Sequence, residues 1–294
     1  MPYLELDVPR KLFPMKKVLL LLVLLLLLGA GVFVFRHNNA VVEPPQMNET
    51  TIPPTLRDVI ARADSTVIPA FSLDYLRGRF DPATHPDFTK VAPEFTDRDG
   101  TYYLRKDAYA AFLAMHAAAA KDGVQLKVIS ATRNFDRQKS IWEAKWTGER
   151  LLEGKEKAPQ VYPDPQARAL AILRWSSMPG TSRHHWGTDM DLNQLNNDYF
   201  ATGQGLAEYQ WLTAHAPTYG FCQPYTAKGL ARPAGYNEEK WHWSYEPIAR
   251  QLTDQARRLL TDQEIDGFLG AETAPTIGVV EKYVLGVSTA CKGG

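Results

Sequence analysis

The sequence predicts an α+β domain, in which a small antiparallel sheet is flanked by helices, preceded by a single N-terminal transmembrane helix. Segments with helical spacing are interspersed with short segments of strand pattern, and few residues belong to the strands. This mixture is typical of α+β architecture rather than of a parallel, doubly wound sheet. A leucine-rich run without charge near the N-terminus predicts the membrane helix.

The apolar run extends over residues 18–35 and, as a helix, would be roughly 27 Å long, which is just enough to cross a bilayer core. Lys16 and Lys17 precede it, and this positive flank predicts that residues 1–17 are cytoplasmic and that the chain after the run is exported. A cleaved signal peptide is the alternative, although its apolar core usually has about 7–15 residues. In the first case the domain is anchored to the membrane outside the cytoplasm, and in the second it is secreted.

Composition and charge balance restrict the character of the chain beyond the membrane segment. With 45% hydrophobic and 22% charged residues, the chain resembles ordinary globular proteins. Its 33 basic residues balance 33 acidic residues, so there is no reason to expect a nucleic-acid partner. Residues 36–55 are rich in Asn, Pro, Thr and Glu and are expected to be a linker. We expect the domain over residues 56–260 and a C-terminal tail over residues 261–294.

Helical and strand patterns succeed one another along the domain. A short helix is expected first, and the next is the clearest, because Ala108, Phe112, Met115 and Ala119 follow helical spacing and Gly123 ends the helix. Strands are expected where apolar residues alternate or where short aromatic runs occur. The predicted helices are residues 56–63, 104–120, 136–146, 166–175, 206–215 and 248–260. The predicted strands are residues 124–130, 188–193 and 241–245.

The chain has two cysteines, Cys222 and Cys291. An exported chain permits a disulfide between them, which would attach the tail to the domain and add roughly 4 kcal/mol in the chain-entropy model. Two free thiols are the alternative.

Two segments about fifty residues apart combine the residue types of a catalytic metal site. Residues 182–191 have the sequence SRHHWGTDMD, and residues 238–243 have the sequence EEKWHW. His184, Asp191 and His242 would supply the three protein ligands that catalytic zinc takes, with the fourth position left for water. Glu239 would then accept a proton from that water. Gly187 would allow the sharp turn before the strand that carries Asp191.

Each of these histidines alone would more often be a surface or core residue, so the hypothesis depends on the whole set. The sequence contains no His-Glu-x-x-His helix, no Gly-x-Ser-x-Gly turn and no Ser-x-x-Lys motif, so neither a helical zinc protease nor a serine nucleophile has support.

The motif Ser182-x-His184-x-x-Gly187-x-x-x-Asp191, followed by Glu239-x-Trp241-His242, resembles the D-alanyl-D-alanine carboxypeptidases of the VanY type. These enzymes share a zinc fold with murein endopeptidases and the Hedgehog N-terminal domain. A third element, Ser130-x-x-Arg133-x-x-x-x-Gln138, also matches, and the resemblance covers about residues 104–245.

The resemblance implies that His184, Asp191 and His242 bind Zn²⁺ and that Glu239 is the catalytic base. It also implies that Arg133 stabilises the oxyanion, while Gln138 and Ser182 bind the terminal carboxylate of a peptidoglycan peptide. A guanidinium suits a position where negative charge develops, because it always carries its charge. The expected catalytic residues are therefore Glu239 and Arg133, and the expected substrate-binding residues are Ser182 and Gln138. The expected metal ligands are His184, Asp191 and His242.

Asp189 departs from the family pattern, which has a small residue there. Asp189 and Asp191 share one face of a strand, so Asp189 would either assist the metal site, as a partner of a ligand or an additional ligand, or be a solvated carboxylate. His185 and Glu238 are weaker rivals of His184 and Glu239, and the assignment of Glu239 requires a turn before His242.

Three functions are therefore expected in order of preference. The first is a zinc carboxypeptidase that removes the terminal D-Ala from peptidoglycan stem peptides. The second is a zinc endopeptidase of the same fold, and the third is a non-catalytic module that binds the cell wall. The intact Glu239 argues against the third.

Overall fold

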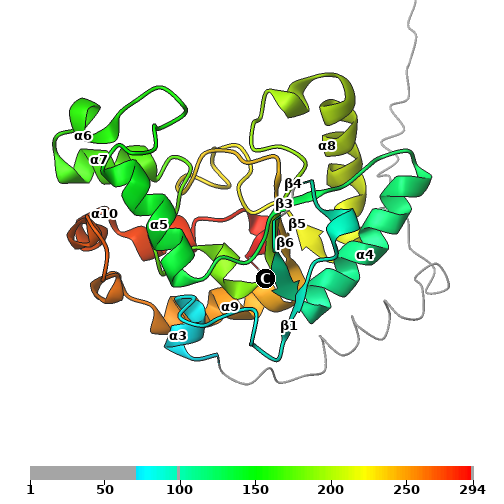
Figure 1. Cartoon of the computed structure of the whole chain (residues 1–294), viewed down its shortest axis with the longest axis horizontal. Helices are drawn as coiled ribbons and strands as arrows, with labels where there is room; N and C mark the ends of the chain where they lie inside the picture. The colour runs from blue at the N-terminus through cyan, green and yellow to red at the C-terminus, as the bar shows by residue number, and fades with distance from the viewer. Residues whose placement is uncertain (1–70, 98–99, 293–294) are drawn as a thin grey trace, which may run out of the picture. The chain divides into compact units, whose positions relative to one another are not determined.

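A four-stranded antiparallel sheet lies at the centre of the domain, and helices surround it (Figure 1). The computed structural model describes residues 71–97 and 100–292. The strand order in this sheet is β3-β4-β6-β5, and a second sheet pairs β1 with β2. The strands are β1 (Phe88–Lys90), β2 (Tyr103–Arg105), β3 (Val128–Ser130), β4 (Asp189–Leu192), β5 (Phe221–Cys222) and β6 (His242–Tyr245). The prediction of a small antiparallel sheet flanked by helices is confirmed.

The five longer helices among the described residues lie where the sequence predicted helices, and three short helices of four residues each were not predicted. The helices are α3 (Leu73–Leu76), α4 (Lys106–Lys121), α5 (Phe135–Trp146), α6 (Ala158–Val161), α7 (Pro165–Ile172), α8 (Gly203–His215), α9 (Glu246–Leu259) and α10 (Ala274–Ile277). Asn134 caps α5 by accepting a hydrogen bond from the Arg137 amide at 2.9 Å. This cap fixes where α5, the helix that carries Gln138, begins.

Several predictions concern residues outside the described part of the chain. These are the N-terminal segment 1–17, the membrane segment 18–35, the linker 36–55 and the helix 56–63. Among the residues that the structure describes, no helix combines the length and the apolar character needed to span a membrane. The predicted strand 124–130 is shorter than expected: β3 begins at Val128, and its register with β4 is irregular.

The pairing of β4 with β6 positions a group of buried polar residues at the centre of the domain. Asp191 lies opposite His242, and Asp189 lies opposite Ser244. All four residues of each strand are buried. Because side chains alternate along a strand, the two aspartates and their two partners share one face of the sheet.

A tight turn at Gly187 joins the short helix η3 (Arg183–Trp186) to β4. Gly187 has φ of +75°, a left-handed conformation that favours glycine. A Cβ atom at this position would lie 2.3 Å from the Phe88 ring. The turn predicted at Gly187 is therefore confirmed, and both its backbone angle and its surroundings require glycine.

The segment after Leu260 packs against the rest of the domain. Its apolar residues are largely buried in the core, among them Ile265, Ile277, Val284 and Val287. Cys222 and Cys291 form a disulfide across 69 residues of sequence, as predicted. The disulfide joins β5 to the end of this segment.

We expect Gly187→Ala to lower the free energy of unfolding by about 2–5 kcal/mol, because left-handed strain and overpacking against Phe88 add together. Gly123→Ala is the matched control, since Gly123 has φ of +77° but a Cβ atom there would meet no atom within 4 Å. It should cost only the strain, about 1–2 kcal/mol. Urea denaturation measures both values, and equal losses would show that the space around Gly187 is unimportant.

Candidate functional site

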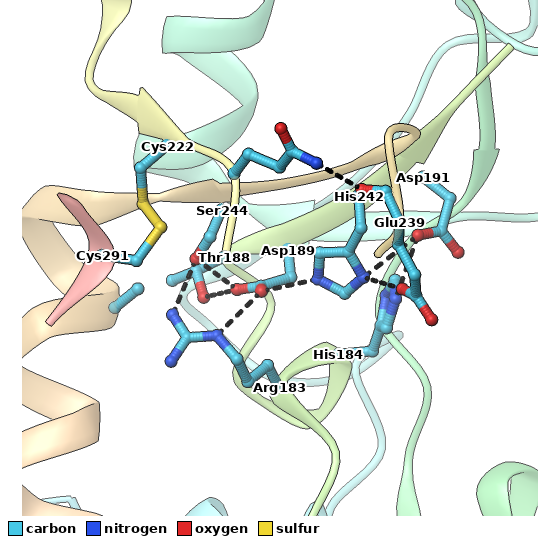
Figure 2. Close-up of polar contacts among 12 residues, drawn as sticks. Arg183, His184, Thr188, Asp189, Asp191, Cys222, Glu239, His242, Ser244 and Cys291 are labelled. Atoms are coloured by element: carbon cyan, nitrogen blue, oxygen red, sulfur yellow. Dashed lines mark hydrogen bonds and ion pairs between the residues drawn. A yellow bond between two sulfur atoms is a disulfide. The ribbon is translucent and has the colours of Figure 1, made fainter. Parts of the chain in front are cut away.

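Three buried side chains from separate elements converge on one point. His184 comes from η3, Asp191 from β4 and His242 from β6 (Figure 2). One ligand atom from each lies within 4.8 Å of the other two. The imidazole rings of His184 and His242 meet edge to face, with their centroids 4.6 Å apart. These are the three residues that the sequence predicted as metal ligands, and the structure brings them together.

Hydrogen bonds determine which nitrogen of His184 faces this point. Its Nδ1 lies 2.9 Å from the carbonyl oxygen of Ala131, which can only accept, so Nδ1 carries the proton. Nε2 is then free to bind a cation, and it lies 3.4 Å from Asp191 Oδ1. His185 turns elsewhere, because its Nδ1 lies 2.6 Å from the carbonyl oxygen of Arg133. The choice of His184 over His185 thus has a geometric basis.

His242 faces the same point with Nδ1, whereas His184 faces it with Nε2. Its Nε2 lies 2.8 Å from Asp189 Oδ2, and its Nδ1 lies 3.3 Å from Asp191 Oδ1 and 3.2 Å from Glu239 Oε2. The His242 amide donates to the Glu239 carbonyl oxygen at 3.4 Å across a turn. This turn, which the sequence analysis required, brings the Glu239 carboxylate to the same side as the His242 ring.

Asp189 is fully buried, so the interpretation as a solvated carboxylate is wrong. It accepts hydrogen bonds from Arg183 Nε at 3.1 Å, Thr188 Oγ1 at 2.6 Å and Ser244 Oγ at 2.7 Å, in addition to its contact with His242 (Figure 2). Because it lies at the far nitrogen of His242, it orients this ring rather than joining the three ligands.

Arg183 is the counter-ion of Asp189, and the sequence analysis did not single it out. Its guanidinium also donates to Thr253 Oγ1 at 2.9 Å and Ser244 Oγ at 2.8 Å, with no exposed side-chain surface. Burial opposes ionisation of Asp189, but the Arg183 charge and the contact with His242 hold its pKa well below the usual range. An arginine directly before a predicted ligand, with an aspartate six residues later, was the available signal.

The charges around His242 favour a cation at the site. Burial acts against protonation of His242, but its contacts with Asp189, Asp191 and Glu239 raise its pKa well above the usual value. Burial raises the pKa of Glu239, although His242 acts in the opposite direction. Burial, and then the charge of Arg133, lowers the pKa of His184 to about 4. His184 is therefore a neutral ligand at physiological pH.

The residues present fit a bound metal ion. Asp191 Oδ1 is buried and has no hydrogen-bond partner among the described residues, although two imidazole nitrogens lie 3.3 Å and 3.4 Å from it. A divalent cation at this point would satisfy that oxygen and both nitrogens at once. Two neutral imidazole nitrogens with one carboxylate oxygen form a ligand set typical of transition metals rather than of Mg²⁺ or Ca²⁺.

Arg133 lies beside this group. Its Nη1 is 3.8 Å from Asp191 Oδ2 and donates to Ser130 Oγ at 2.8 Å, and its backbone amide donates to the His184 carbonyl oxygen at 3.1 Å. Its Nε is buried and has no partner in the described structure. A guanidinium with unused donors next to the ligands can stabilise negative charge that develops on a bound molecule.

Gln138 and Ser182 are buried, and neither side chain has a hydrogen bond to the three ligands in the described structure. Gln138 Nε2 donates to the Ser177 carbonyl oxygen at 2.8 Å. Gln138 Oε1 and Ser182 Oγ are buried and lack a hydrogen-bond partner among the described residues. Both side chains thus keep a polar atom for a ligand, and their role in substrate binding stays a prediction.

An α+β domain with a buried His-Asp-His group and an adjacent carboxylate defines a class of candidate metallohydrolases. The family model described as VanY, D-alanyl-D-alanine carboxypeptidase, matches residues 101–248. This chain belongs to that family. The matched range contains every residue that the sequence analysis assigned to the site.

Relatives and solved structures resemble parts of the chain. The protein YodJ of Bacillus subtilis is 30% identical over 178 residues, which cover 58% of this chain and 56% of YodJ. A D-alanyl-D-alanine carboxypeptidase of Enterococcus faecalis is 32% identical over 128 residues, which cover 44% of this chain and 42% of the relative. The chain thus spans about half the length of these curated relatives. The solved LdcB LD-carboxypeptidase is 23% identical with a TM-score of 0.44, and the match covers 70% of this chain and 81% of LdcB.

We expect Asp189→Asn to destabilise the protein by about 3–5 kcal/mol, because it leaves the buried Arg183 charge without its counter-ion. Arg183→Met should also destabilise it. The double variant should lose clearly less than the sum of the two single losses, since neither charge is then left unpaired. Guanidinium denaturation of the four proteins measures this coupling, and simple additivity would contradict the pairing.

Proposed function

We propose that this protein is a zinc-dependent carboxypeptidase that removes the terminal D-alanine from peptidoglycan stem peptides. The observation that carries the proposal is the convergence of His184, Asp191 and His242 within 4.8 Å, with Glu239 in contact with His242. Membership of the VanY family supports both the reaction and the substrate class.

The ligand set supports zinc as the metal. Catalytic zinc takes three protein ligands of the histidine and carboxylate type and keeps one position open. When bound, zinc supplies a water molecule of lowered pKa and polarises the carbonyl group of the scissile bond. His184 Nε2, an Asp191 carboxylate oxygen and His242 Nδ1 would hold the ion.

Glu239 is the proposed general base. Its carboxylate is buried beside His242 Nδ1, where an attacking water would be activated. Burial raises its pKa, which makes it a better proton acceptor and keeps the proton available for the leaving amine. The Glu239 carbonyl oxygen accepts from Gln223 Nε2 at 3.0 Å, so its backbone is held in place.

The remaining residues have roles in binding and charge stabilisation. Arg133 would stabilise the oxyanion with donors that the folded protein leaves unused. Gln138 and Ser182 would bind the free terminal carboxylate, which favours a carboxypeptidase over an endopeptidase.

We also propose that the domain works outside the cytoplasm, attached to the membrane by residues 18–35 or secreted if that segment is cleaved. The apolar run with its positive N-terminal flank supports export. The Cys222–Cys291 disulfide is consistent with an oxidising compartment.

The proposal predicts that Glu239→Gln lowers kcat by about 10²–10⁴-fold while zinc stays bound, because the base is lost and the ligands are kept. Glu238→Gln, at the adjacent carboxylate, should have nearly wild-type activity. Mass spectrometry of purified pentapeptide muropeptides should show loss of one alanine with the wild type. Cleavage inside the stem would instead support an endopeptidase, and no product from a zinc-loaded protein would support a binding module.

Zinc affinity should rise with pH by about tenfold per unit below the raised pKa of His242. The metal-free site keeps His242 protonated at neutral pH, whereas zinc requires its neutral Nδ1, so binding releases a proton. Calorimetric titration with zinc, repeated in buffers of different ionisation enthalpy, counts the released protons. A pH-independent affinity without proton release would contradict this arrangement of charges.

A further inference from the structure

Lys145 shares one face of α5 with Gln138. The two residues are seven apart, about two turns of helix, so their side chains project to the same side. Lys145 Nζ donates to Ser176 Oγ at 2.5 Å, and Gln138 Nε2 donates to the carbonyl oxygen of the next residue, Ser177, at 2.8 Å. The Lys145 ammonium group and the Gln138 amide therefore face the same segment, residues 176–177. Gln138 is the residue proposed to bind the terminal carboxylate.

A further contact links the segment of residues 176–177 to the metal ligands. Trp175, which precedes Ser176, stacks on Trp241 with ring centroids 5.8 Å apart, and Trp241 directly precedes His242. The charges of Arg133 and Glu239 both act on Lys145. Lys145 thus belongs to the surroundings of the candidate catalytic centre.

Lys145 forms no ion pair with a carboxylate among the described residues. The only described hydrogen bond of its ammonium group is to a neutral hydroxyl group, although the side chain is partly buried. Of the two carboxylates whose charges act on it, Glu239 lies 3.2 Å from His242 Nδ1 and Glu153 lies 3.0 Å from Arg174. Burial, followed by the charges of Arg150 and Arg133, lowers the pKa of Lys145 to about 8, so it is still mainly protonated at pH 7.

A partly buried cation without a counter-ion is costly for a folded protein and is common at binding sites. Two cations, Lys145 and Arg133, lie in this part of the site, and their charges act on one another. Gln138 faces the same segment as Lys145, and its buried Oε1 has no hydrogen-bond partner among the described residues. An anionic group of a ligand would complete the arrangement.

We propose that the Lys145 ammonium group is the counter-ion for a carboxylate of the substrate peptide. This inference rests on the proposed function and extends it, because it assigns an electrostatic contact to a residue outside the motifs. The carboxylate has two sources in a short peptide: its C-terminus, or an acidic side chain on the residue that precedes D-Ala-D-Ala. Both sources offer the same oxygen ligands, and the experiment separates them.

The test measures peptide binding to the full, zinc-loaded chain in the Glu239→Gln background, in which turnover is expected to be about 10²–10⁴-fold slower. Three synthetic peptides ending in D-Ala-D-Ala serve as probes: a free acid with a neutral preceding residue, a C-terminal amide with an acidic preceding residue, and a peptide without any carboxylate. Lys145→Met and Lys145→Arg are compared with the parent by calorimetry. Lys139→Met is the matched control on α5, since Lys139 Nζ donates to the Gly267 carbonyl oxygen instead.

Lys145→Met should weaken binding by about 10–100-fold for at least one of the two carboxylate peptides, as expected for one charge-assisted hydrogen bond. The peptide that responds identifies the source. Lys145→Arg should retain most of the affinity, and Lys139→Met should retain all of it. Binding of the peptide without a carboxylate should not change.

An unchanged affinity for both carboxylate peptides would overturn the role of Lys145 while leaving the proposed function intact. The same is true of an equal loss for all three peptides. If the parent protein binds none of the peptides, both the proposed function and this inference fail.

Discussion

The pairing of β4 with β6 is the constraint on which the site depends. Its register places Asp191 opposite His242 and Asp189 opposite Ser244, all on one face of the sheet. A shift by one residue would turn both aspartates to the other face. The turn at Gly187 leads from η3 into β4, so the same pairing also sets where His184 lies. The pairing of β4 with β6 thus brings two segments that are distant in sequence together in one site.

Compensation among the buried charges explains why the fold tolerates them. Arg183 compensates Asp189, and Asp189 in turn holds one nitrogen of His242. On the other side of that ring, Asp191 and Glu239 are two acids in a buried environment. A proton on His242 balances them partly, and a metal ion would do so more completely. The same feature therefore connects the stability of the core with the proposed chemistry.

Much of this site could be predicted because its residue types and spacing are unusual together, and the strand pattern placed Asp191 and His242 correctly. The role of Asp189 stayed open in the sequence, since period-two alternation shows that two residues share a face but not what covers that face. The buried position of Arg183 depends on Thr253 of α9, 70 residues away, which no local pattern indicates. The strand ending at Ser130 was predicted too long because alternation does not reveal irregular pairing.

Anomalous diffraction at the zinc edge, from crystals of the zinc-loaded protein, shows directly whether His184, Asp191 and His242 hold one ion. One zinc ion should lie about 2.0–2.2 Å from His184 Nε2, an Asp191 oxygen and His242 Nδ1, with Asp189 still in contact with His242 Nε2. A zinc ion bound elsewhere, or one that takes Asp189 in place of Asp191, would contradict this arrangement.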